Sequence, residues 1–256
     1  MASLSGGASE CVFKACEAAE APGYNKLSFV LNPDMNAMPM QDSAADLDQM
    51  IAQQVRTWEV LDPRVLEAMH RVPRAHFVPA EWRSLAFADC ALPLLLGKRM
   101  LTPMLAGRIL QALELEPGDQ VLEIGTGSGY LSACMAAMGG KVRSLELHPE
   151  IANLARGNLL AAGVDGVEVA TADGAALAVA ATYDAIVLTG SLPACDPRFE
   201  RALKHGGRLF VVVGLAPVME ARLVRRLGAS EFSSLSLFET SLEALENVPV
   251  PPAFRF

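Results

Sequence analysis

The spacing of apolar and polar residues changes near residue 118 of this chain. Beyond that point, short apolar runs rich in Val, Ile and Leu alternate with longer stretches of helical spacing. The runs predict five strands, at residues 120–125, 141–147, 167–173, 183–190 and 208–214. The stretches between them predict helices at residues 130–138, 148–163 and 198–207. Because strands that alternate with helices form parallel sheets with helices on both faces, we expect a doubly wound α/β fold.

Weaker patterns lie on both sides of this region. Residues 221–228 and 232–240 predict an antiparallel hairpin, which would bring the mostly parallel sheet to seven strands. Upstream, helical spacing starts at Asp46, and a second helix starts at Asp62-Pro63, where proline suits the first turn. After the irregular residues 80–103, a third helix is expected at 104–115.

These patterns divide the chain into three parts. Residues 1–37 are small and polar without a sustained period, so we interpret them as a flexible N-terminal extension. Residues 38–104 form a helical N-terminal module that ends in an irregular loop, and residues 105–256 form the sheet domain.

Composition and charge exclude several classes of function. The formal net charge is -8 and the sequence pI is about 5.1, which argues against binding to nucleic acid or to an anionic membrane surface. The start MASLSGGASE lacks the pattern of a secretory signal. The five cysteines include no CxxC pair, and the four histidines lack metal-site spacing. We expect a cytoplasmic protein with free thiols and no metal site.

The clearest motif follows the first predicted strand of the sheet. It reads Gly125-Thr126-Gly127-Ser128-Gly129 and leads into a helix, an arrangement that lets a ligand approach the main chain closely. Glu146 ends the next strand, where an acid can accept hydrogen bonds from ribose hydroxyls. Asp173-Gly174 follows the third strand at the same carboxyl edge. A nucleoside ligand is therefore expected at this edge of the sheet.

The details favour S-adenosylmethionine (AdoMet) over a dinucleotide. A dinucleotide fingerprint reads GxGxxG, but its third small position is Tyr130 here. Glu123 lies just before the loop, where a carboxylate suits a cationic amino-acid group better than a pyrophosphate. We therefore expect AdoMet as the cofactor, with Glu123 helping to hold it.

With these motifs, the chain resembles class I AdoMet-dependent methyltransferases, and specifically the protein-L-isoaspartate O-methyltransferase family. The resemblance runs from about residue 46 to the C-terminus and includes DPRVLEAMHRVPRAHFVP, a helical element that most class I methyltransferases lack. It implies a Rossmann-like methyltransferase sheet with an AdoMet-binding domain at 105–256. It also implies that AdoMet is bound by Glu123, Gly125, Thr126, Gly127, Ser128, Gly129, Glu146, Leu147, Asp173 and Gly174.

One loop departs from the family pattern. Family members carry Gly-x-Thr-Ile-Ser-x-Pro, in which a serine or threonine lies beside the transferred methyl group and the substrate carboxylate. Residues 97–103 of this chain read GKRMLTP, so Leu101 occupies the hydroxyl position and Thr102 follows it. Thr102 is therefore the candidate catalytic hydroxyl. A threonine that caps the helix starting at Pro103 would explain the same position.

The resemblance implies an AdoMet-dependent carboxyl methyltransferase that acts on L-isoaspartyl residues of damaged proteins. A carboxylate is already a nucleophile and needs no general base, so the lack of a catalytic triad agrees with this chemistry. Two alternatives remain: an AdoMet methyltransferase with a different acceptor, and a catalytically silent AdoMet-binding protein. We expect isoaspartyl proteins or peptides as partners and a monomeric state.

Overall fold

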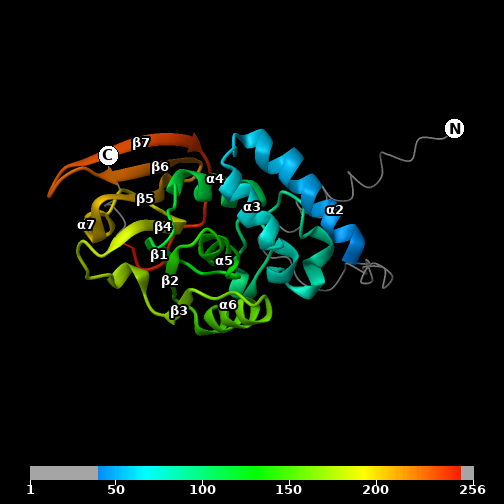
Figure 1. Ribbon diagram of the computed structural model, residues 1–256. Coiled ribbons are helices and arrows are strands. Elements are labelled where there is room, and N and C mark those ends of the chain that lie inside the picture. Colours follow the sequence, from blue (N-terminus) through cyan, green and yellow to red (C-terminus); the bar gives the residue numbers. More distant parts are fainter. Residues whose placement is uncertain (1–39, 249–256) are drawn as a thin grey trace.

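A seven-stranded sheet forms the centre of the molecule (Figure 1). The computed structural model describes residues 40–248. The strand order is β3-β2-β1-β4-β5-β6-β7; the strands up to β5 pair in parallel, and β6 and β7 are antiparallel. The strands are β1 (Gln120–Ile124), β2 (Lys141–Glu146), β3 (Val167–Thr171), β4 (Tyr183–Leu192), β5 (Leu203–Leu215), β6 (Val218–Arg226) and β7 (Phe232–Glu239). The predicted doubly wound fold and its hairpin are confirmed.

Helices cover both faces of this sheet. The longer ones are α2 (Met40–Met50), α3 (Pro63–Arg71), α4 (Pro103–Leu113), α5 (Tyr130–Ala137), α6 (Pro149–Ala161) and α7 (Pro197–Ala202). Shorter helical turns lie at Ile51–Val55, Arg56–Trp58, Arg74–Phe77, Ala80–Leu85, Leu95–Gly97 and Gly174–Ala176. Alternate residues of β1 point to opposite faces: Val121 joins the cluster that contains α3, α4 and α5, and Leu122 joins the cluster that contains α7.

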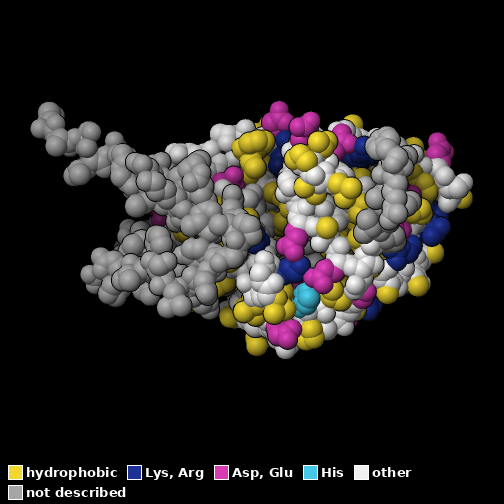
Figure 2. All heavy atoms as spheres, turned by 180° about the vertical axis from the view of Figure 1, so that it is seen from behind, with side chains coloured by type: hydrophobic (Ala, Val, Ile, Leu, Met, Phe, Trp, Pro, Cys, Tyr) yellow, Lys and Arg dark blue, Asp and Glu magenta, His cyan; other side chains and the backbone are white. Residues whose placement is uncertain are grey.

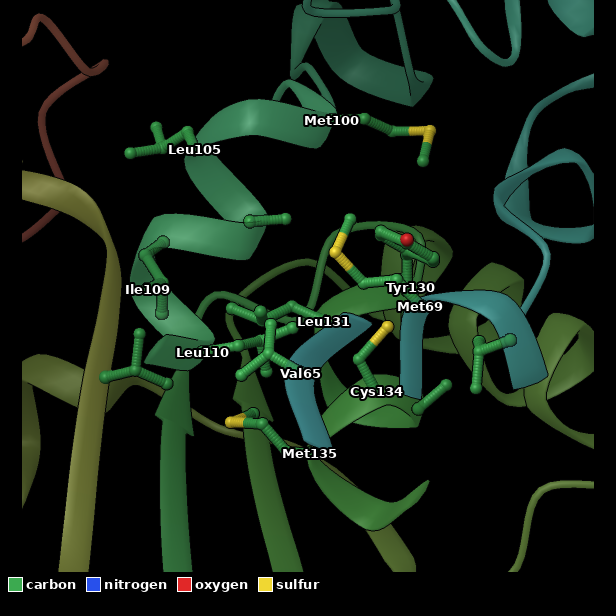
Figure 3. Close-up of a cluster of buried hydrophobic side chains, with 14 of the residues drawn as sticks. Val65, Met69, Met100, Leu105, Ile109, Leu110, Tyr130, Leu131, Cys134 and Met135 are labelled. Carbon is green, nitrogen blue, oxygen red and sulfur yellow. The ribbon is translucent and has the colours of Figure 1, made fainter. Parts of the chain in front are cut away.

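The N-terminal helices share their core with the sheet domain. In Figure 3, side chains of α3, α4 and α5 point toward one another, among them Val65, Leu110 and Leu131. All three side chains are buried, so the helical module packs as part of one hydrophobic core. The division into 38–104 and 105–256 stays a prediction, and the expected extension at residues 1–37 lies outside the described residues.

Two predicted helices differ from the structure by several residues in their bounds. The first N-terminal helix begins at Met40 rather than near Asp46, and after Met50 it continues as a wider turn. The helix predicted at 198–207 was wrong in its second half, because α7 ends at Ala202 and β5 begins at Leu203. There Leu203 pairs with Tyr183, and residues 204–207 bulge from the ladder before pairing resumes at Arg208. Pairing with β4 outweighs the helical spacing of this segment.

No helix among residues 40–248 is long and apolar enough to cross a membrane.

Candidate active site

A cavity of about 380 Å³ opens at the carboxyl edge of the sheet. Six of the residues predicted to bind the cofactor line it, and they follow or end three neighbouring strands: Gly125, Gly127, Glu146, Leu147, Asp173 and Gly174. The cavity lies where β1 neighbours both β2 and β4, the point at which the strand order reverses. Ligands of open α/β sheets bind at this point because the connections leave it in opposite directions.

Residue 125, the first glycine of the loop, must be glycine because its backbone approaches β4 closely. Gly125 has φ +94°, and a Cβ at this position would collide with Oγ1 of Thr189. That hydroxyl donates hydrogen bonds to the main-chain oxygens of Ile124 and Gly125, at 3.0 and 2.7 Å. Thr189 therefore fixes the turn that leaves β1, and any side chain at residue 125 would disrupt it.

Two acids mark the edge of the cavity at the ends of β2 and β3. Glu146 is 6% exposed, and its two carboxylate oxygens accept from the backbone N–H groups of Gly127 and His148, at 3.1 and 3.2 Å. Asp173 accepts from the N–H of Ala175 at 2.8 Å and from Nδ2 of Asn247 at 3.0 Å. Each carboxylate oxygen keeps further lone-pair capacity, so both acids are suited to bind hydroxyl or amino groups of a ligand.

Glu123 lies below the loop and does not line the cavity. Its side chain is fully buried and accepts hydrogen bonds from the hydroxyls of Ser132 and Ser144, and Ser144 also pairs with Thr126 at 2.6 Å. Burial raises the pKa of Glu123 to about 7. The carboxyl supports the loop from beneath, because its strand position directs it toward Ser132 of α5 and Ser144 of β2. A role of Glu123 in holding the cofactor stays a prediction.

Three other residues of the predicted set also stand behind the cavity wall: Thr126, Ser128 and Gly129. The hydroxyl of Thr126 bonds to Ser144, and the carbonyl oxygen of Ser128 accepts from Nδ2 of Asn158 at 2.9 Å. Gly129 is the N-cap of α5 with φ +87°. These residues hold the shape of the loop, and any contact of theirs with a cofactor stays a prediction.

The loop at residues 97–103 forms the opposite wall of the same cavity. Both Leu101 and Thr102 line it. Oγ1 of Thr102 accepts from the N–H of Leu105 at 3.2 Å, so Thr102 caps α4, as the capping interpretation expects. In the described part of the chain Oγ1 donates to no acceptor, which leaves its proton available on the cavity side. The two interpretations of Thr102 are therefore compatible.

A segment that carries no sequence motif closes the third side of the cavity. Residues 240–248 follow β7, and all of them except Asn247 line the cavity together with the strand ends. Main-chain hydrogen bonds at 2.8 and 3.0 Å join Ser191 to Glu243 and Leu245. Glu246 contacts Nε2 of His148 at 2.8 Å and Nζ of Lys98 at 2.9 Å. This polar segment gave no periodic signal, so only its long-range contacts reveal its place at the site.

Within residues 40–248, no group of three or more His, Cys, Asp or Glu side chains is placed to hold a metal ion. The acids at the cavity edge are engaged with backbone N–H groups, basic side chains and Asn247. The remaining lone pairs of these acids can accept hydrogen bonds from hydroxyl or amino groups of a ligand.

Comparison with known proteins agrees with this geometry. Residues 45–240 match the family model for protein-L-isoaspartate(D-aspartate) O-methyltransferase (PCMT). A protein-L-isoaspartate O-methyltransferase of Koribacter versatilis is 37% identical over 195 residues, which cover 76% of this chain and 87% of that protein. The corresponding protein of Methanoculleus marisnigri is 40% identical over 186 residues, covering 72% and 84%.

Solved structures show the same fold. A Plasmodium falciparum protein, described as a protein-L-isoaspartate O-methyltransferase in complex with S-adenosyl-L-homocysteine, superposes with a TM-score of 0.67. The match covers 80% of this chain and 98% of that chain at 17% identity. With the family match, the cavity and its strand-end residues, this chain belongs to the protein-L-isoaspartate(D-aspartate) O-methyltransferase family.

Proposed function

We propose that the protein transfers a methyl group from AdoMet to the carboxylate of L-isoaspartyl residues in damaged proteins. The observation that supports this most is the single cavity that joins the Gly125–Glu146 edge to the loop at residues 97–103. One ligand at the strand ends and a second at the loop would then meet inside one partly enclosed cavity. Family membership supplies the substrate class.

The lining residues fit AdoMet. Glu146 offers lone pairs to the ribose hydroxyls, and the absence of side chains at Gly125 and Gly127 lets the ligand approach the main chain. Ile151 and Ala175 line the same end of the cavity and give the adenine an apolar surface. When bound, AdoMet supplies a methyl group that its sulfonium has already activated.

The protein's part in the reaction is to align the reactants and exclude water. The substrate carboxylate needs no base, so positioning inside a partly enclosed cavity supplies most of what the chemistry requires. We propose that the hydroxyl of Thr102 donates a hydrogen bond to the acceptor while its oxygen still caps α4. Leu101, which lines the cavity beside Thr102, contributes apolar surface in place of the family's hydroxyl.

Leu101 also favours a second candidate function. A loop that lacks the usual hydroxyl suits an AdoMet methyltransferase whose acceptor is a different oxygen, nitrogen or carboxylate group. A catalytically silent AdoMet-binding protein is the third possibility, and it predicts binding without transfer.

We also propose that the protein acts as a cytoplasmic monomer without nucleic acid as a partner. The net charge of -8 supports the last point. On the face shown in Figure 2, basic side chains are interspersed with acidic and apolar ones and form no continuous patch over the described atoms. Sedimentation equilibrium, with and without added RNA, tests both the monomeric state and the proposed lack of nucleic-acid binding.

A methyl-transfer assay on a matched peptide pair tests the proposed function. The protein is incubated with methyl-labelled AdoMet and either an isoaspartyl peptide or the same peptide with a normal aspartyl linkage. We expect label in the isoaspartyl peptide alone. Equal labelling of both peptides supports a different acceptor, and absence of label despite AdoMet binding supports the silent protein.

A further inference from the structure

The cationic side chains that line the cavity differ in whether an acid already neutralises them. Nζ of Lys98 lies 2.5 Å from Glu243 and 2.9 Å from Glu246. Nη1 of Arg108 lies 3.1 Å from a carboxylate oxygen of Glu59, and its guanidinium carbon lies 4.6 Å from the ring centroid of Phe238. The positive charges of Lys98 and Arg108 are therefore both balanced by contacts within the protein.

Arg99 is the exception among these cations. It lines the cavity and is partly buried, yet it forms no ion pair with any acid among residues 40–248. Its Nη1 donates to the main-chain oxygen of Ala91 at 3.2 Å, the one hydrogen bond of its side chain in this part of the chain. A guanidinium has five N–H donors, so most of the binding capacity of Arg99 remains for a ligand.

The backbone of Arg99 is fixed in a short hairpin. Residues 93 and 99 form an antiparallel bridge, and the N–H of Met100 donates to the main-chain oxygen of Leu92 at 2.8 Å. Arg99 and Leu101, the position at which the family hydroxyl is missing, both line the cavity from this loop.

We infer that Arg99 binds the free carboxylate of the isoaspartyl substrate and sets the enzyme's preference for it. In an isoaspartyl linkage the chain runs through the side-chain carboxyl group, which leaves the α-carboxylate free. The planar guanidinium can meet that carboxylate through two parallel hydrogen bonds. The inference rests on the proposed function, since it names the residue that recognises the reacting group.

The charge balance of the reaction decides which kinetic constant Arg99 controls. A carboxylate oxygen forms a bond to the methyl carbon, the methyl–sulfur bond breaks, and its electron pair stays on sulfur. The carboxylate becomes a neutral ester, the sulfonium becomes a neutral thioether, and no proton moves. Because the negative charge fades toward the transition state, Arg99 stabilises the bound substrate more than the transition state. It therefore lowers KM without raising kcat, and it loses its ionic partner once the ester has formed.

The test compares Arg99→Gln and Arg99→Lys with Arg83→Gln. Arg83 is exposed and does not line the cavity, so its variant controls for the change in net charge. We expect Arg99→Gln to raise KM for an isoaspartyl peptide roughly 10- to 100-fold with kcat unchanged or higher, the loss of a charge-assisted pair. Arg99→Lys should restore part of the affinity, and Arg83→Gln should match the wild type.

A second readout measures binding without methyl transfer. Calorimetry on protein saturated with S-adenosylhomocysteine compares the isoaspartyl peptide with an analogue whose α-carboxylate is a neutral carboxamide. We expect Arg99→Gln to weaken binding of the carboxylate peptide and to leave the carboxamide peptide unaffected. Equal loss for both peptides, or no change in either KM or Kd, would overturn the role of Arg99. The wild type could fail to label the isoaspartyl peptide in preference to its aspartyl twin, while Arg99→Gln still weakens binding of the carboxylate peptide alone. In that case the proposed reaction fails and the recognition site stands.

If, in addition, the wild type binds the carboxylate and carboxamide peptides equally, both proposals fail.

Discussion

Nη2 of Arg74 donates to the main-chain oxygen of Leu101 at 2.9 Å. The same guanidinium reaches the main-chain oxygens of Ala86 and Cys90, at 2.7 and 3.4 Å. Arg74 is fully buried, and burial lowers the pKa of its side chain. One buried cation therefore fastens the loop at 97–103 to the segment that precedes it, using backbone oxygens instead of a carboxylate.

Replacing Arg74 should destabilise the protein. Arg74→Met removes the donors for three main-chain oxygens, two in buried contacts and one in a part-buried contact. We expect a loss of about 2–5 kcal/mol in the free energy of unfolding. Arg71→Met is the matched control, because Arg71 is exposed and makes a single 3.4 Å contact with Ala137. Urea unfolding of both variants checks the difference. Similar unfolding curves for the two variants would show that the Arg74 contacts contribute no stability.

Glu146 should carry much of the affinity for AdoMet. Glu146→Ala removes acceptors for ribose hydroxyls and for the N–H of Gly127, so we expect affinity to fall roughly 10- to 100-fold. Glu150 is exposed, lies in the first turn of α6 and does not line the cavity. Glu150→Ala should therefore leave affinity unchanged. Calorimetry that shows both variants binding like the wild type would remove Glu146 from the cofactor site.

Alanine substitutions at Gly125 and Gly118 distinguish the cost of a steric collision from the cost of backbone strain. The φ angles of these glycines are +94° and +92°, but a Cβ meets Thr189 at the first and nothing within 4 Å at the second. Gly118→Ala should cost about 1 kcal/mol of stability through strain alone. Gly125→Ala should cost more and also weaken AdoMet binding, because the turn must move. Thermal unfolding with and without AdoMet checks this, and equal effects of the two substitutions would contradict the role of Thr189.

Thr102 allows its two roles to be separated by substitution. Thr102→Asn keeps an N-cap acceptor but loses the hydroxyl, whereas Thr102→Val loses both and Thr102→Ser keeps both. We expect Thr102→Val to lose about 1 kcal/mol of stability, and both the Val and Asn variants to lose roughly tenfold in methyl transfer. Urea unfolding and the peptide assay check the two losses separately. Full activity in the less stable Thr102→Val variant would assign this residue to capping alone.

The buried carboxyl of Glu123 should make stability depend on pH. Its pKa of about 7 in the folded protein lies above its ordinary value, so the folded state binds the proton more tightly than the unfolded state. The stabilisation is then complete at low pH and is lost as pH rises through about 7. Relative to Glu123→Gln, the wild type should lose about 1 kcal/mol per pH unit between roughly pH 5 and 7. Parallel pH profiles of the two proteins in urea unfolding would contradict this.

The sequence predicted those elements whose pattern of apolar residues and turns lies within one short stretch of the chain. The strand–glycine loop–helix unit and Glu146 follow from short apolar runs and their turns, and the parallel topology then brings the strand ends together. The full burial of Glu123 beneath the loop could not be predicted from its position next to the glycines. The direction of that side chain depends on its hydrogen bonds with Ser132 and Ser144.

The parts that sequence patterns missed depend on contacts between distant residues. Asn247 reaches Asp173, and Glu243 pairs with Ser191, although residues 240–248 carry neither motif nor period. The end of α7 at Ala202 is likewise set by pairing of the following residue with β4. Tertiary pairing of this kind overrides local propensity, so only the folded chain reveals it.

The most direct test of the account is a crystal structure of the protein with S-adenosylhomocysteine and an isoaspartyl peptide bound together. We expect the ribose against Glu146 and the free carboxylate of the peptide at the loop of residues 97–103, facing the sulfur atom. A peptide bound elsewhere on the protein, or with its carboxylate turned away from the sulfur, would contradict the proposed reaction.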